Sequence, residues 1–167
     1  KALLKKLGDL PIIAEDLGVI TPAVEALRDQ FHFPGMRILQ FAVGSDPKAD
    51  DYRPESYPKN CVVYTGTHDN DTTRGWFESA SEEEREFALV YLGVTGDDIA
   101  WDLIRAAWRS RAVYAIAPLQ DILDLGTEAR MNLPGTLAGN WDWRVREGAF
   151  SEARRERLAT LNRETGR

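Results

Sequence analysis

The sequence contains few of the residues that build disulfides and metal centres. Its 167 residues include one cysteine, Cys61, and two histidines, His32 and His68. A single cysteine excludes a disulfide within the chain and a thiolate-rich metal site. No apolar run approaches the ~20 residues that a membrane-spanning helix needs. We therefore expect no membrane association and a reducing compartment such as the cytoplasm.

The chain also lacks a basic tract. It carries 21 lysines and arginines against 27 aspartates and glutamates, which gives a formal net charge of -6. We expect no nucleic-acid partner, because such partners are bound through clustered positive charge. Hydrophobic residues make up 43% and charged residues 29% of the chain, as is usual in globular domains. At this length, one domain with a substantial core is predicted.

Short apolar runs alternate with helical signals along the chain. We expect strands at 12–14, 36–43, 62–64 and 112–117. Helices are expected after Thr21-Pro22, after the capping box of Ser81 and Glu84, after Asp97 or Asp98 and after Ser151, with a short helix or a turn at 118–125. Such alternation is typical of βα units and predicts an α/β fold with a parallel sheet.

Four βα units equal half of a (β/α)8 TIM-type barrel. An open doubly wound sheet is the alternative, and both folds place their sites at the carboxyl ends of the strands. The chain starts at Lys1, and residues 1–7 resemble the end of a helix closed by Gly8. We therefore expect residues 1–167 to be one partial barrel domain of a longer protein.

Polar side chains gather where two of the expected strands end. The run His68-Asp69-Asn70-Asp71 follows the strand at 62–64, and Glu15 and Asp16 follow the strand at 12–14. Side chains alternate along a strand, so only one of Glu15 and Asp16 should face a given cleft. Paired carboxylates on one rim are typical of enzymes that act on glycosidic bonds. Each carboxylate could instead cap a helix or start a turn.

Aromatic rings are the second feature expected of a sugar site, because they cover the apolar faces of sugars. The spacing of Trp101 and Trp108 is helical, which favours a place in the core. Trp76 and Trp141 fall in or near predicted rim loops and are the better candidates for substrate binding. Trp143 is ambiguous between the two positions.

Four motifs occur in a fixed order along nearly the whole chain. They lie at 14–18 (AEDLG), 34–41 (PGMRILQF), 64–72 (YTGTHDNDT) and 130–136 (RMNLPGT). Together they closely resemble the C-terminal half of amylomaltases, the bacterial-type 4-alpha-glucanotransferases of the α-amylase superfamily. The resemblance implies the C-terminal half of a (β/α)8 barrel. It also implies a cytoplasmic enzyme, or a plastid enzyme if the source is a plant.

The resemblance further implies a retaining double displacement that transfers segments of α-1,4-glucans between maltooligosaccharides, without a cofactor or a metal. Matched position by position, Glu15 corresponds to the general acid/base and Asp69 to the transition-state stabiliser. His68 corresponds to a residue that binds a glucose hydroxyl beside Asp69. Asn132 and Pro134 correspond to the loop that lines the cleft.

The family's nucleophile has no counterpart in this sequence. That aspartate belongs to an earlier strand, and only fourteen residues precede Glu15. We therefore expect the chain alone to be inactive and its partner to be the missing N-terminal half of the same barrel. A half barrel would also leave two sheet edges unpaired.

Two other functions remain open at this point. Trp76 and Trp141, together with the missing nucleophile, are also compatible with a non-catalytic glucan-binding module. A metal-dependent hydrolase built on His68 and Asp69 is the second, although it would need further ligands.

Overall fold

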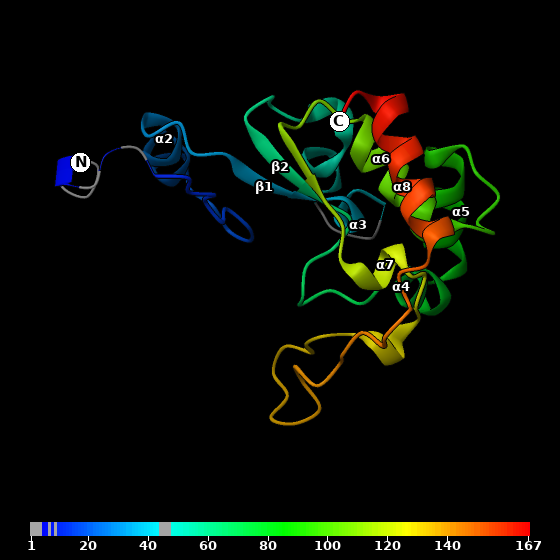
Figure 1. The fold of residues 1–167 in the computed structure, drawn as a ribbon. Helices are drawn as coiled ribbons and strands as arrows, with labels where there is room; N and C mark the ends of the chain where they lie inside the picture. Colours follow the sequence, from blue (N-terminus) through cyan, green and yellow to red (C-terminus); the bar gives the residue numbers. More distant parts are fainter. Residues whose placement is uncertain (1–4, 7, 9, 44–47) are drawn as a thin grey trace.

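A parallel sheet lies at the centre of the protein. The computed structural model describes residues 5–6, 8, 10–43 and 48–167, and within them three strands form one sheet in the order β1-β2-β3 (Figure 1). The strands are β1 (Gly35–Ile38), β2 (Cys61–Tyr64) and β3 (Tyr114–Ile116). Both neighbouring pairs are parallel, as the βα alternation predicts.

Helices connect and cover these strands. Their bounds are α2 (Pro22–Gln30), α3 (Leu39–Val43), α4 (Thr73–Ser79), α5 (Glu82–Leu92), α6 (Ile99–Arg109), α7 (Leu119–Ile122) and α8 (Glu152–Thr165). Short 3₁₀ helices lie at η1 (Ala49–Tyr52), η2 (Pro54–Ser56) and η3 (Thr127–Ala129). The predicted capping box of Ser81 and Glu84 is confirmed at the start of α5, and Ser151 caps α8. No helix in the described ranges is both long enough and apolar enough to cross a membrane.

The strand expected at 12–14 is wrong. This segment runs past β1 with one backbone hydrogen bond, from Ala14 N to Pro34 O at 2.9 Å. Pro34 has no N–H group to extend a ladder, and Ile13 is exposed. Within the described residues, no strand pairs with the other side of this segment, so no hydrogen-bond ladder holds it in strand form. The helical end expected at residues 1–7 lies largely outside the described residues, although Gly8 has the positive φ, 73°, of a helix-ending glycine.

The strand expected at 36–43 is correct only in its first part. β1 ends at Ile38, and the chain then turns into α3, where Leu39, Ala42 and Val43 are buried. A short apolar run that is buried on all sides does not distinguish a strand from a helix.

Helix α4 was not predicted, and its composition explains why. It contains Gly75, a weak helix former. A Cβ atom at Gly75 would lie 2.3 Å from the Thr127 hydroxyl, so the close packing of α4 against η3 requires the glycine. The Thr72 side chain caps α4 by accepting from Gly75 N at 3.0 Å.

The core lies between the sheet and the helices on one of its faces. Val63 of β2 packs there with Leu103 and Ile104 of α6, and Trp101 and Trp108 are buried in the same core, as predicted. On the opposite face of the sheet, Tyr114 is 58% exposed and Ile116 is 41% exposed. Val62 and Ile38 on this same face are buried, so the face is covered in part and open at β3.

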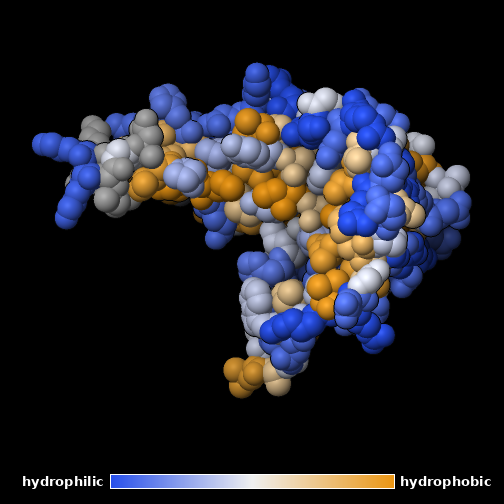
Figure 2. Space-filling model, in the orientation of Figure 1, coloured by the Kyte–Doolittle hydropathy of each residue, from blue (hydrophilic) through white to orange (hydrophobic). Residues whose placement is uncertain are grey.

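The segment that contains α2 extends away from the rest of the molecule (Figure 1). No residue of α2 is buried, and Val24 and Leu27 on this helix are exposed. Apolar side chains gather along this arm and its junction with the sheet (Figure 2). Such a surface is unusual for a protein that functions as an isolated monomer.

Candidate active site

Glu15 and Asp16 point to different surroundings, as the alternation of side chains predicts. The Asp16 side chain is only 4% exposed, accepts a hydrogen bond from Met36 N at 2.6 Å and pairs with Arg28 and Arg37. It joins the arm to β1 and has a structural task. Glu15 is exposed and lines the space above the sheet ends. Of the two carboxylates, Glu15 is the one available for chemistry.

The four polar residues in the loop after β2 form two pairs with different roles. The Asn70 side-chain oxygen accepts from Thr67 N at 2.8 Å and from the Thr67 hydroxyl at 2.9 Å. Asp71 accepts from Thr72 N and from the Thr127 hydroxyl, both at 2.8 Å. Asn70 and Asp71 therefore shape the turn. About half of the His68 and Asp69 side chains is exposed, so these two remain available to a ligand.

Asp69 is held against a second loop, which begins after η3. Asn132 Nδ2 donates to Asp69 Oδ1 at 2.6 Å, and His68 Nε2 lies 3.4 Å from the same oxygen. Arg130 donates to two main-chain carbonyls, that of Asp69 at 2.6 Å and that of Asn132 at 2.9 Å. Arg130 thus fastens the two loops together. Its role was not predicted, although it stands in the motif at 130–136.

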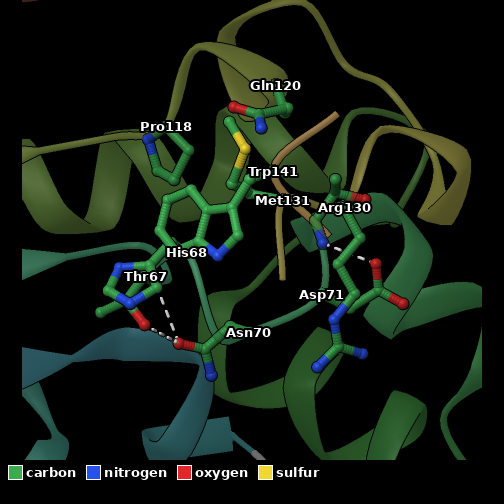
Figure 3. A pocket seen from close by; sticks show the side chains of 10 residues that line it. Thr67, His68, Asn70, Asp71, Pro118, Gln120, Arg130, Met131 and Trp141 are labelled. Carbon is green, nitrogen blue, oxygen red and sulfur yellow. Dashed lines mark hydrogen bonds between the residues drawn. The ribbon is translucent and has the colours of Figure 1, made fainter. Parts of the chain in front are cut away.

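Trp141 presents its ring beside His68. The two ring centroids are 5.1 Å apart with an angle of 38° between the planes, and Trp141 is 53% exposed (Figure 3). Trp141 N donates to Met131 O at 2.7 Å, which fixes the main chain at this residue. Trp76, the other rim candidate, is half-buried against the core. Trp141 is therefore the tryptophan best placed to meet a ligand.

Glu15 and Asp69 border the same open cavities. One, of about 510 Å³, is also lined by His68 and Tyr64. A second, of about 720 Å³, adds Pro134. Burial raises the pKa of the Tyr64 hydroxyl, which therefore keeps its proton at neutral pH. The structure thus brings together Glu15, His68, Asp69 and Pro134 around shared space, with Asn132 and Trp141 in contact with the same loop.

A metal centre at His68 and Asp69 finds little support in the surrounding side chains. In the part of the chain that the structure describes, no three His, Cys, Asp or Glu residues are grouped as metal ligands would be. His32, the other histidine, follows α2, and its carbonyl accepts from Asn60 Nδ2 at 3.0 Å.

Comparison with known proteins identifies the family of this chain. The sequence profile of the 4-alpha-glucanotransferase family, glycoside hydrolase family 77, matches residues 1–150. The chain belongs to this family. It is 60% identical over 147 residues to a 4-alpha-glucanotransferase of Synechocystis sp.. The aligned region covers 86% of this chain and 29% of that protein. It is 46% identical over 168 residues to the Thermus thermophilus 4-alpha-glucanotransferase, which covers 96% and 33%.

Solved structures show the same relation. The amylomaltase of Streptococcus agalactiae in complex with acarbose superposes with a TM-score of 0.92 at 36% identity, over 99% of this chain and 34% of that protein. The chain spans about a third of the length of the 4-alpha-glucanotransferases that it matches. The family resemblance of the four sequence motifs is thus confirmed.

Proposed function

We propose that this chain supplies the acid/base and transition-state-stabilising part of a 4-alpha-glucanotransferase. The observation that carries the proposal is that Glu15 and Asp69 border the same cavities at the carboxyl end of the sheet. Glu15 protonates the departing glycosidic oxygen and later removes the proton from the incoming sugar hydroxyl. A retaining mechanism needs one carboxyl that performs both steps. The substrates are maltooligosaccharides and other α-1,4-glucans.

Asp69 stabilises the reacting sugar when positive charge develops on its ring. Its Oδ1 already accepts from Asn132, which leaves Oδ2 to accept hydrogen bonds from sugar hydroxyls. His68 contributes a further hydrogen bond to the same sugar, and Pro134 limits the cleft on its loop side. The exposed ring of Trp141 forms a platform for a neighbouring glucose unit.

The remainder of a (β/α)8 barrel is the partner of this chain. Tyr114 and Ile116 of β3 and the apolar side chains of the arm are exposed, as the C-terminal half of a barrel separated from its remainder would leave them. The nucleophilic carboxylate lies on that remainder. We place the assembled enzyme in the cytoplasm, or in the plastid if the source is a plant.

The test uses the Synechocystis relative as a host. In a full-length chimera, this chain replaces the segment of the relative that it matches. We expect the chimera to disproportionate maltotriose into glucose and longer maltooligosaccharides, and we expect this chain alone to leave maltotriose unchanged. Mixing this chain with the part of the relative that it does not match should restore turnover. A folded chimera without activity would refute the proposed function.

Glucan binding without catalysis is the second candidate, because Trp141 exposes its ring beside His68. Trp141→Ala should weaken maltoheptaose binding to the chimera by about tenfold or more, as expected for loss of ~1.5 kcal/mol of ring contact. Trp143→Ala, two residues away, is the matched control and should leave the affinity within about twofold. Isothermal titration calorimetry measures both. Equal losses in the two variants would remove Trp141 from the site.

A further inference from the structure

A buried carboxylate lies beneath the loop that carries His68 and Asp69. Asp121, in α7, is 1% exposed. Its Oδ2 accepts from the Thr65 hydroxyl at 2.5 Å and from the Thr73 hydroxyl at 2.9 Å, and its Oδ1 accepts from Thr73 N at 2.8 Å. Every one of these donors is itself fully buried.

The two threonines mark the two ends of the loop. Thr65 directly follows β2, and Thr73 is the first residue of α4. Between them lie seven residues, 66–72, which include His68 and Asp69. One carboxylate therefore ties the start and the end of this loop to the same point in α7, and it fixes the span that the loop must bridge.

Within the described residues, no cation forms an ion pair with the Asp121 carboxyl. The nearby Asp124 is a second carboxylate and pairs with Arg74 instead. Burial raises the pKa of the Asp121 carboxyl, and the hydrogen bonds from Thr65 and Thr73 oppose that rise. A buried carboxylate with three donors and no cation costs stability that an apolar side chain would not. It does, however, fix three donors in one geometry.

We propose that Asp121 is a positioning residue that holds the 66–72 loop in the shape that aims His68 and Asp69 into the cleft. The effect reaches the substrate only through those two side chains, so this inference rests on the proposed function. It predicts that loss of the carboxylate releases the loop and misplaces Asp69, while the fold of the remaining protein persists. Displacement of about 1 Å at a reacting group can cost about 10²-fold in rate.

The test compares Asp121→Ala, Asp121→Asn and Leu161→Ala in the chimera. The side-chain oxygen of asparagine can still accept from Thr73 N, and its NH₂ group can donate to the two threonine hydroxyls if these rotate to accept. Asparagine should therefore preserve most of the loop geometry. Leu161 is a core residue of α8, and its truncation lowers stability without touching the loop. We measure kcat and KM for maltotriose, the melting temperature, and hydrogen–deuterium exchange of peptides that span 66–72.

Asp121→Ala should lower kcat by about 10²-fold, with a smaller change in KM, and should accelerate exchange in the 66–72 peptides. Asp121→Asn should lower kcat by about tenfold or less. If the alanine variant does not fold, loop exchange in the asparagine variant decides the role of Asp121. Leu161→Ala should lower the melting temperature while kcat, KM and loop exchange stay unchanged. The inference is overturned if the Asp121 variants exchange in this loop as the unsubstituted chimera does. If the unsubstituted chimera is inactive, the proposed function fails, and loop exchange still decides the role of Asp121.

Discussion

Glu15→Gln in the chimera is expected to lower kcat for maltotriose disproportionation by about 10²–10⁴-fold, the usual contribution of a general acid/base. Glutamine has nearly the same size and retains hydrogen bonding, but it can neither deliver nor remove the proton. Glu15 is exposed and forms no ion pair with the other described residues, so its substitution should leave the fold intact. Chromatographic quantification of released glucose measures the rate.

A donor with a leaving group that needs no proton sharpens this experiment. With maltosyl fluoride, the first step no longer depends on an acid, so the Glu15→Gln variant should release its first equivalent of fluoride at nearly the rate of the unsubstituted chimera. Later turnovers should stay slow, because transfer to the acceptor sugar still needs Glu15 as the base. Glu25→Gln is the matched control, because Glu25 lies exposed on the same arm in α2. Equal slowing of maltotriose turnover and of this first fluoride release would show that Glu15 does not protonate the leaving group.

Asp69→Asn is expected to lower kcat by about 10²–10³-fold with both donors. The substitution retains the shape of the side chain but removes the negative charge that faces the developing oxocarbenium ion. In the proposed mechanism Asp69 acts on the sugar and not on the leaving group, so the fluoride donor should not restore the rate. The two carboxylates are thus distinguished by their response to the same donor.

The control for Asp69→Asn is Asp142→Asn, an exposed aspartate outside the cavities that Asp69 lines. It should keep the full rate with both donors. Recovery of the Asp69→Asn rate with maltosyl fluoride would contradict the role of stabiliser and would indicate that Asp69 assists the proton transfer instead. Thermal unfolding of each variant verifies that the rates refer to folded protein.

Local signals predicted those parts of the fold that local contacts determine. Helix starts at Ser81 and Ser151 were predictable because a capping side chain bonds to a backbone group three residues away. The segment at 12–14 has strand composition, but it forms no ladder, because pairing depends on neighbours that are distant in sequence. The same limit applies to 39–43, whose apolar residues would suit either a buried strand or a buried helix.

The candidate site shows the same division. The exposed position of His68 and Asp69 after β2 was predictable, because the carboxyl end of a parallel strand is the usual place for polar groups that meet a ligand. Their binding roles stay predictions. The roles of the neighbouring residues were not predictable. Asn70 and Asp71 are also polar, but their side chains bond to the backbone of the turn. Arg130 bonds to Asp69 across 61 positions, and Asp121 bonds to Thr73 and Thr65 across 48 and 56 positions. Nothing in the local sequence of Arg130 or Asp121 indicates those contacts.

The hydrogen bonds of Arg130 affect which substitutions this site can accept. Its guanidinium holds the main-chain carbonyls of Asp69 and Asn132 and neither of their side chains. A carbonyl is the same whatever residue carries it, so substitutions at positions 69 and 132 leave this fastening in place. The scaffold and the recognition chemistry are therefore separable here, so position 132 can be varied by directed evolution to retune sugar selectivity while Asp69 keeps its carboxylate and the main-chain bonds of Arg130 stay in place.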